Sequence, residues 1–370
     1  MMIKGMTGRI FVVVGIIGVI TTVSAIIYIQ WAHIRAKGYM QHDIMVVTPV
    51  INNTSAMFSR ARVEETADNF DGRIETIELS GIFMQNPGNG NTAFAHTIIT
   101  GQNYFNMTHT EFAGGEPWQH NKGNDIVLCT SLAWRLFGSI DVVGLAVDIG
   151  NTRYTVSGIT ETESGIQAPG QFHGFAWMPS DINNPGQASI LLLQPRNYNR
   201  LNSHLDTVRF ITDLGLHSQN YIITDINVYI ESINIRGKVL LGFAGFCFVA
   251  AATWYIWKMI KNERRTGRMQ FKIEWVWIAG LVIANAAVIA LLIPNITMDL
   301  WTPDFMNLGW GRYIQLVFNN GLLENPQHLP SHFVALHGWN QRASVAFWVG
   351  MVGIAGVVLR RFGKSSTTAT

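Results

Sequence analysis

The sequence predicts a membrane protein with four transmembrane α-helices and a large α+β extracytoplasmic domain between the first and second helices. Three observations indicate this fold class. Of the 370 residues, 48% are hydrophobic and only 14% are charged, whereas soluble domains are about 25% charged. Long apolar stretches occur towards both ends of the chain. Lys and Arg residues gather beside these stretches, on what would be one side of a bilayer.

The first predicted span covers residues 10–30, which include no charged side chain. At about 1.5 Å per residue, this helix is long enough for the roughly 30 Å hydrocarbon core of a bilayer. Apolar sequence continues beyond the small residues at 23–25, so we expect an uncleaved anchor rather than a signal peptide. The other predicted spans cover about 239–257, 275–298 and 343–359. The last is the shortest, and the glycines within it suit close helix packing; they are Gly350, Gly353 and Gly356.

These spans divide the chain into seven parts. They are 1–32 (N-terminus and first span), 33–237 (extracytoplasmic domain), 238–258 (second span), 259–273 (cytoplasmic loop), 274–298 (third span), 299–342 (extracytoplasmic loop) and 343–370 (fourth span and cytoplasmic tail).

Basic residues predict the orientation. Eleven of the 26 Lys and Arg residues lie in three flanks that an even number of spans places on one side. By the positive-inside rule that side is the cytoplasm, so both termini are predicted to be cytoplasmic and residues 33–237 to lie outside. Four basic residues flank the spans on the outer side: Arg35, Lys37, Arg236 and Lys238. The eleven are Lys4, Arg9, Lys258, Lys261, Arg264, Arg265, Arg268, Lys272, Arg360, Arg361 and Lys364.

The extracytoplasmic domain reads as two intermixed parts. Residues 75–180 contain short β-like runs separated by Gly, Asn and Pro clusters, and we expect them to form a mostly β insert. The flanks at 45–70 and 196–212 look helical, while "SILLLQ" and "NYIITD" look like strands. Both flanks together are therefore predicted to form one α+β unit. Residues 224–243 contain neither Pro nor Gly before Gly237, so a helix is expected to run from the domain towards the second span.

A helix followed by a hairpin is predicted over residues 130–160. Thr130 or Ser131 is placed to cap the helix, and Gly138 is placed to end it. Gly150–Asn151 then forms a two-residue turn between alternating apolar runs. Just before the helix, Cys129 is expected to be a buried, inert thiol. The other cysteine, Cys247, falls in the second span, so the redox compartment stays open.

Several of these motifs resemble one family. They are Tyr104–Phe105, Gly114–Gly115, "NDIVLCTSLAWRLFG", "GLAVDIGN" and "YTVSGIT". With them, residues 98–160 resemble the periplasmic core domain of the MacB-type and FtsX-type ABC transporter permeases. The predicted order of one helix, an outside domain and three further helices is similar to that of the family.

The resemblance implies a permease subunit of the bacterial plasma membrane, working as a homodimer or as a heterodimer with a second permease. A cytoplasmic ABC ATPase would supply ATP-driven motion, which the helices transmit to the outside domain for export, extraction or regulation of a substrate there. The chain itself is not expected to hydrolyse ATP. Its GK[ST] at Gly363–Ser365 has Val358 where a P-loop requires glycine.

The cytoplasmic loop is the expected docking site for such an ATPase. Within "NERRTGR", we take Glu263, Arg264, Arg265 and Gly267 as candidate coupling residues, because the family's coupling helix has a similar pattern. An alternative is that the loop is only a positively charged anchor facing lipid headgroups.

No catalytic, cofactor or metal site is predicted, and the net charge of +2 gives no case for nucleic acid. His328, His332 and His337 lie near one another, but Pro330 disfavours a regular helix through the first two, and interfacial histidines are favoured over a zinc site. The main alternative function is a membrane-anchored binding or assembly module that works without an ATPase. The identity of the cargo is not readable from the residues.

Overall fold

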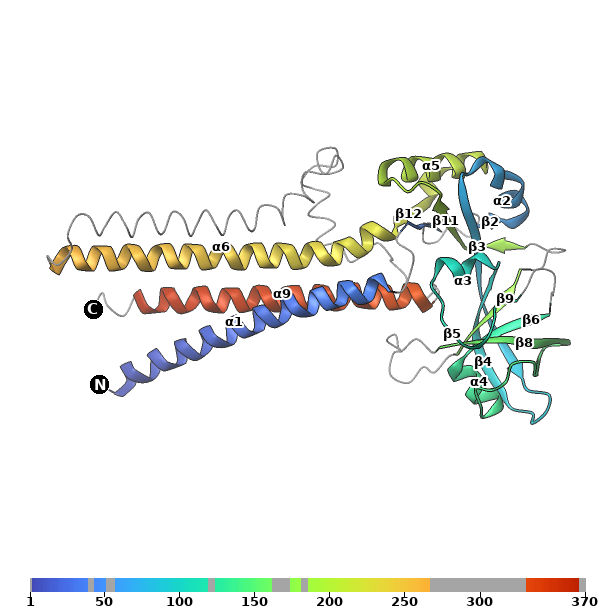
Figure 1. Cartoon of the computed structure of the whole chain (residues 1–370), viewed down its shortest axis with the longest axis horizontal. Helices are drawn as coiled ribbons and strands as arrows, with labels where there is room; N and C mark the ends of the chain where they lie inside the picture. The colour runs from blue at the N-terminus through green and yellow to red at the C-terminus, as the bar shows by residue number, and fades with distance from the viewer. Residues whose placement is uncertain are drawn as a thin grey trace. The chain divides into compact units, whose positions relative to one another are not determined.

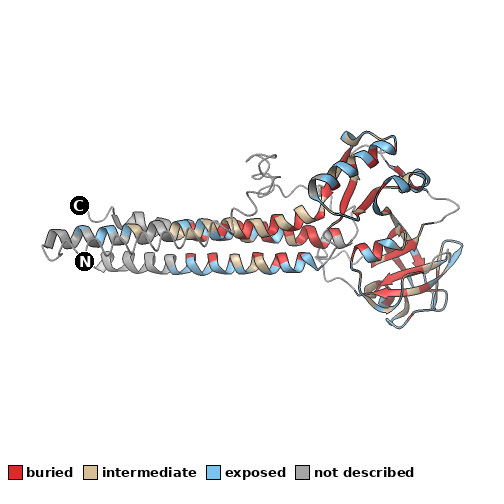
Figure 2. Cartoon of the chain, turned by 45° about the horizontal axis from the view of Figure 1, so that its top comes forward, coloured by how far each residue is buried: buried red, intermediate tan, exposed pale blue. Residues whose placement is uncertain are grey.

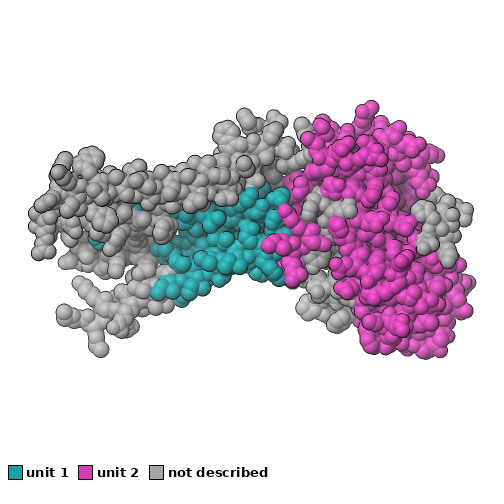
Figure 3. Space-filling view, viewed as in Figure 1, with its two compact units in different colours: residues 1–33, 231–320, 340–370 teal, residues 34–230, 321–339 magenta. Residues whose placement is uncertain are grey.

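The computed structural model describes residues 2–38, 43–50, 57–118, 124–161, 174–180, 186–266 and 331–365 (Figure 1). The chain consists of two compact units (Figure 3). The helical unit comprises residues 1–33, 231–320 and 340–370, and the large domain comprises residues 34–230 and 321–339.

The large domain is built around one mixed sheet. Ten of the described strands follow the order β12-β1-β11-β3-β4-β9-β6-β8-β5, with β7 paired to β3 and β8. The strands are β1 (Met45–Pro49), β2 (Phe58–Ser59), β3 (Gly72–Gln85), β4 (Thr92–Thr100), β5 (Phe112–Gly115), β6 (Asp125–Cys129), β7 (Ala146–Ile149), β8 (Thr152–Thr160), β9 (Gly174–Pro179), β10 (Gln187–Ala188), β11 (Ile190–Pro195) and β12 (Tyr221–Asp225). The helices are α2 (Arg60–Thr66), η2 (Ala67–Asn69), α3 (Asn103–Met107), α4 (Thr130–Phe137), α5 (Arg200–Asp213) and η3 (Ser218–Asn220).

Strand β3 belongs to both halves of this domain. Its residues 72–77 pair with β11, and its residues 78–85 pair with β4. The flank half contains β1, β2, β10, β11, β12, α2, α5 and residues 72–77 of β3. The insert half contains the remaining strands, α3, α4 and residues 78–85 of β3. The sequence prediction of a mostly β insert within an α+β unit agrees with this arrangement.

The flank half has its own apolar core, in which α5 lies against β1 and β12 (Figure 1). Phe210 of α5 contacts Phe70, with ring centroids 5.5 Å apart, and Phe58 stacks on Tyr221 at 4.9 Å. One prediction here was wrong, because residues 45–49 form strand β1 rather than a helix. Residues 45–47 are all buried, since β1 lies between β11 and β12.

The predicted helix and hairpin are confirmed as α4, β7 and β8. Gly138 ends α4 in the left-handed region at φ 73°, and Gly150 opens the turn at φ 58°. The predicted cap was wrong: Cys129 holds the N-cap position, and its side chain makes no capping hydrogen bond to the helix backbone. Thr130 is already helical, and its hydroxyl donates to the Thr160 carbonyl at 2.7 Å. Cys129 is buried as predicted.

The helical unit contains long helices, α1 (Met2–Lys37), α6 (Ile226–Thr266) and α9 (Ser331–Ser365), whose first or last residues extend into the large domain. The stretch 16–38 is the one among the described residues that is long and apolar enough to cross a membrane. The second and fourth predicted spans lie within α6 and α9, and the third lies outside the described residues. Helix α9 begins at Ser331 rather than near 343, so the end of the segment predicted as a loop is helical.

The helical unit exposes large apolar side chains. Exposed positions of α1, α6 and α9 carry large apolar side chains, including Ile20, Phe246 and Val352, which are 58–71% exposed. Buried positions of α1 instead recur every three or four residues and are mostly small: Gly18, Thr22, Ala25, Ile29 and Ala32. Figure 2 shows buried and exposed positions alternating along these helices.

Candidate functional site

The candidate coupling residues from the sequence lie at the end of helix α6 and directly after it. Glu263, Arg264 and Arg265 fall at the C-terminal end of α6, where side chains are not described, and Gly267 lies outside the described residues. Their proposed role therefore stays a prediction. Among the predicted histidines, His337 is buried on α9, where its Nδ1 lies 3.1 Å from the Tyr229 hydroxyl. Within the described part of the chain, no group of three potential metal ligands occurs.

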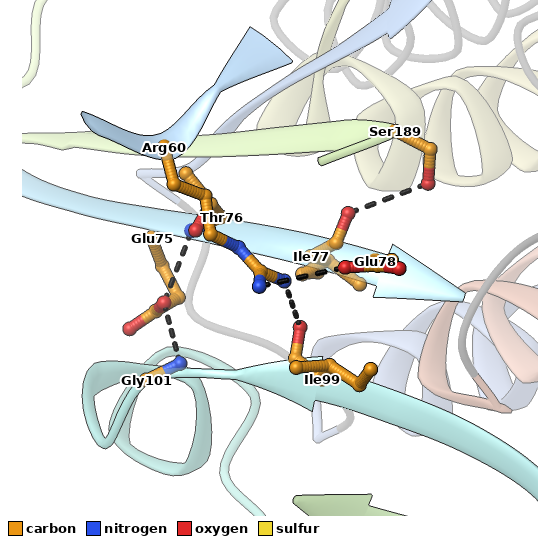
Figure 4. Close-up of polar contacts among 8 residues, drawn as sticks. All are labelled: Arg60, Glu75, Thr76, Ile77, Glu78, Ile99, Gly101 and Ser189. Carbon is orange, nitrogen blue, oxygen red and sulfur yellow. Dashed lines mark hydrogen bonds and ion pairs between the residues drawn. The ribbon is translucent and has the colours of Figure 1, made fainter. Parts of the chain in front are cut away.

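A buried arginine joins the two halves of the large domain (Figure 4). Arg60 is the first residue of α2 in the flank half and is only 4% exposed. Its Nη2 donates to the Ile99 carbonyl of β4 at 2.9 Å, and its Nη1 lies 3.4 Å from Glu78 Oε2 on β3. Both acceptors belong to the insert half. The guanidinium thus links α2 to the strand pair that begins where β3 changes partner.

A buried carboxylate makes a second link across the same joint. Glu75 lies in the part of β3 that pairs with β11, and it is 6% exposed. Its Oε1 accepts hydrogen bonds from the backbone N–H of Gly101 at 2.7 Å and of Thr76 at 3.0 Å. Gly101 directly follows β4. Nearby, the Ile77 carbonyl accepts from the Ser189 N–H at 2.9 Å and from its hydroxyl at 3.3 Å (Figure 4).

Burial dominates the electrostatics of this joint. Burial raises the pKa of Glu75, against the opposite effects of the two backbone donors and of Arg60. It lowers the pKa of Arg60, while Glu78, Glu75 and Glu64 act in the opposite direction. A guanidinium keeps its proton in proteins, so Arg60 remains the positive partner of this cluster.

Polar contacts also connect the helices of the helical unit pairwise. Arg236 of α6 is fully buried, and its Nη1 donates to the Asn340 carbonyl of α9 at 3.1 Å and to the Asn340 Oδ1. His33 Nε2 of α1 lies 3.4 Å from Glu231 Oε1 of α6. The Thr22 hydroxyl lies 3.2 Å from the Gly350 carbonyl of α9.

Glycines allow these helices to approach closely. A Cβ on Gly353 would overlap Thr21 Oγ1 and would lie 2.7 Å from the Gly18 carbonyl. A Cβ on Gly350 would lie 2.5 Å from a Leu240 methyl. These two positions confirm the predicted close helix packing at Gly350 and Gly353, and the assignment of this segment as a fourth span stays a prediction.

The N-terminus of α6 is fixed within the large domain. Asp225 Oδ1 accepts from the Val228 N–H at 3.2 Å, and its Oδ2 accepts from the Tyr198 hydroxyl at 2.7 Å. The Ile226 N–H donates to the Ile44 carbonyl at 3.0 Å. An acidic side chain satisfies exposed N–H groups and favours the positive end of a helix. Helix α6 therefore starts from a held position and continues without a break for 41 residues.

The buried charged side chains Arg60, Glu75 and Arg236 bond to backbone atoms or to neighbouring side chains. Sequence reasoning missed Arg60, Glu75 and Asn340, and it noted Arg236 only as a flanking charge. A charged residue at the edge of an apolar span can indicate a buried polar contact, because a buried charge requires a partner.

Comparison with known proteins agrees with the motifs in the sequence. Residues 10–212 match the family model described as "MacB-like periplasmic core domain", which confirms the resemblance and extends it beyond 98–160. No curated protein matches the sequence.

Three solved structures are similar to parts of this chain at low identity. The periplasmic region of MacB from Actinobacillus actinomycetemcomitans is 12% identical, with a TM-score of 0.42, over 54% of this chain and 95% of that one. The extracellular domain of the noncanonic ABC-type transporter YknZ from Gram-positive bacteria is 11% identical, with a TM-score of 0.38. The match covers 49% of this chain and 99% of that one. A permease domain from Porphyromonas gingivalis is 16% identical, with a TM-score of 0.37. The match covers 50% of this chain and 92% of that one.

Proposed function

The chain belongs to the MacB-like periplasmic core domain family, and we propose that it is the permease subunit of an ABC transporter. In this proposal a partner ATPase drives motion of the membrane helices, and the helices move the large domain outside the membrane. The observation that carries the proposal is α6, one uninterrupted helix whose first residue is held by the sheet of the large domain.

The exposed apolar side chains of the helical unit support its placement in lipid. Moving an exposed Ile, Val, Phe or Trp side chain from water into an apolar environment is favourable by roughly 1.5–3 kcal/mol. Fully buried Arg236 would in turn be costly at a lipid-exposed position. A bilayer around α1, α6 and α9 satisfies both requirements. In this placement the protein crosses the membrane several times. The distribution of Lys and Arg then puts the large domain outside and both termini in the cytoplasm.

The length and continuity of α6 support the transmission of motion. At about 1.5 Å per residue, its 41 residues extend for about 60 Å, which is about twice the hydrocarbon thickness of a bilayer. It connects the end of the predicted cytoplasmic flank to Asp225 without a proline. A shift of its cytoplasmic end would therefore reach β12, which directly precedes the helix.

Docking of the ATPase is assigned to Glu263, Arg264, Arg265 and Gly267, at and beyond the C-terminal end of α6. The permease would act as a dimer, with itself or with a second permease. The cargo is a molecule that the large domain expels, extracts or regulates outside the membrane.

Co-purification tests this function. The detergent-solubilised full chain, expressed at native level in its own host, is expected to bring down a nucleotide-hydrolysing subunit. The double variant Arg264→Ala/Arg265→Ala should lose that subunit at least tenfold. The matched control is Arg360→Ala/Arg361→Ala, which removes two positive charges from the predicted cytoplasmic tail and should retain it.

Equal loss in both variants would mean that the charges only anchor the chain to headgroups. Absence of any ATPase, with the large domain's activity unaffected when residues 259–272 are deleted, would favour the ATPase-independent binding or assembly module.

A further inference from the structure

The two halves of the large domain meet at a change of strand partner. Between Ile77 and Glu78, the pairing of β3 passes from β11 on one side to β4 on the other. At such a step the backbone ladder on each side of β3 covers only part of the strand. Pairing between β3 and β4 ends at Glu78 and Ile99, and Gly101 lies beyond the last paired residue of β4.

Charged side chains bond to the backbone at this point. Arg60 donates to the carbonyl of Ile99, and Glu75 accepts from the N–H of Gly101, so both bonds cross from the flank half to the insert half. The Arg60–Glu78 ion pair crosses in the same direction. Two charged side chains, each under a tenth exposed, are therefore used on one short segment, residues 99–101.

A gain in folding stability does not by itself explain why Arg60 and Glu75 are buried here. Burying an ion pair generally costs about as much as its attraction returns, and apolar residues of similar volume are often as stable. Charged hydrogen bonds are directional, however, because a guanidinium fork and a carboxylate hold their partners in fixed geometry. Such bonds can hold a joint at one angle, whereas apolar contacts alone would allow it to slide or tilt.

The shape of the backbone matches this use. A Cβ on Gly101 would lie 2.7 Å and 2.9 Å from the two oxygens of Glu75. Glycine at 101 therefore lets the carboxylate reach the backbone, and any other residue would push it away.

We propose that Arg60, Glu75 and Glu78 form a clamp, closed on residues 99–101, that fixes the angle between the two halves so that they move as one body. The inference rests on the proposed function, in which α6 displaces the flank half and the insert half must follow. Without the clamp, motion of the flank half would be absorbed at the joint.

Distance measurements between the halves test the clamp. Spin labels on cysteines replacing Asp206 of α5 and Asn151 of the β7–β8 turn report the angle, in the detergent-solubilised full chain with Cys247→Ala. Both label positions are exposed, and Cys129 is buried. The wild-type joint is expected to give a single narrow distance distribution by double electron–electron resonance.

Two variants open the clamp by independent routes. Arg60→Met removes the guanidinium at similar length, and Gly101→Ala displaces Glu75 while leaving every charge in place. Each should at least double the width of the distribution. The matched control is Arg196→Met, which removes an exposed arginine 3.8 Å from Asp71 and should leave the width unchanged.

The proposal is wrong if the wild-type distance distribution is already broad. It is also wrong if Arg60→Met and Gly101→Ala both unfold cooperatively and both give distance distributions as narrow as that of the control. Should Arg60→Met fail to fold, Gly101→Ala decides the outcome. No ATPase or nucleotide is present in this experiment, so a narrow wild-type distribution that broadens in the variants keeps the clamp even if no ATPase co-purifies. Loss of the clamp would likewise leave the co-purification result intact.

Discussion

The large domain and the helical unit differ in what their exposed and buried positions carry. In the large domain, the flank-half core is built from Phe58, Phe210 and neighbouring apolar side chains, all nearly inaccessible. In the helical unit, Phe246 is 67% exposed and Val352 is 71% exposed, while Arg236 is fully buried. This difference agrees with the proposed placement of the large domain in water and of the helical unit in lipid.

Buried charge serves different purposes in the two units. In the large domain it lies at the joint between the halves, where Arg60 and Glu75 bond to the backbone at and just after the end of β4. In the helical unit polar groups connect one helix to another, as the proposed placement in lipid requires, because apolar contacts between helices gain little over contacts with lipid. Substitutions can therefore sharpen or break the comparison, starting with the largest expected effect.

Asn340→Leu should destabilise the helical unit most. The variant removes the side-chain acceptor of a buried guanidinium, and a hydrogen bond to a charged group contributes about 1.5–3 kcal/mol. We expect a loss of about 3 kcal/mol in the free energy of unfolding, measured by SDS titration in mixed micelles. Gln341→Leu, at the exposed neighbouring position, is the control and should change little. Equal effects at 340 and 341 would argue against a specific Arg236–Asn340 contact.

Gly353→Ala should have the next largest effect. Its Cβ would overlap Thr21 Oγ1 and the Gly18 carbonyl, so α1 and α9 must separate. Overpacking of this kind costs about 1–3 kcal/mol, and the same titration should show about 2 kcal/mol. Ala355→Val adds carbon atoms at an exposed position of α9 and should be neutral in micelles. A destabilising Ala355→Val would contradict the lipid-facing assignment.

Glu75 should give the large domain a pH-dependent stability of known sign. Burial raises its pKa, so its contribution to the free energy of unfolding is most favourable below the ordinary glutamate value, about 4.3. That contribution declines as the pH rises through the raised native value. The free energy of unfolding of the wild type minus that of Glu75→Gln should therefore fall as the pH rises. Urea unfolding of the solubilised chain, followed by fluorescence, measures it. A difference that grows with pH would show that Arg60 and the backbone donors outweigh burial.

The smallest effect is expected at the exposed Asp148–Arg153 pair in the β7–β8 hairpin. Arg153 donates to both carboxylate oxygens at 2.8 Å and 3.2 Å, and it lowers the pKa of Asp148. Any contribution is present above the ordinary aspartate value and is lost as the pH falls through the lowered native value. Water screens exposed pairs, so Asp148→Asn should leave the Tm at pH 7 unchanged within error. A clear drop would show that exposed charges matter more in this domain than the comparison implies.

Local signals allowed part of the fold to be predicted. Gly138, Gly150–Asn151 and the alternation around Val147 and Val156 predicted α4 and the hairpin, because turns and amphipathic patterns depend on nearby residues. Strand β1 was predicted as helix, because a short run that is buried on both sides shows no alternation. The start of α9 was missed, since residues 331–342 are less apolar than the span that follows.

The polar sites depend on distant residues. Arg60 bonds to Ile99 across 39 positions, Glu75 to Gly101 across 26, and Arg236 to Asn340 across 104. Each pairing follows from strand order or helix packing, neither of which a single sequence specifies. Only the charge at the edge of the second span offered a hint.

Labelling of single cysteines in cells tests the placement of the two units most directly. In a chain with Cys247→Ala and buried Cys129, one cysteine replaces Asn151 in the large domain and another, in a separate chain, replaces Thr367 near the C-terminus. A membrane-impermeant maleimide, added to cells with a permeabilised outer envelope, should label position 151 at once and position 367 only after lysis of the plasma membrane. Labelling of 367 before lysis, or protection of 151 until lysis, would contradict the assignment of the large domain to the outside.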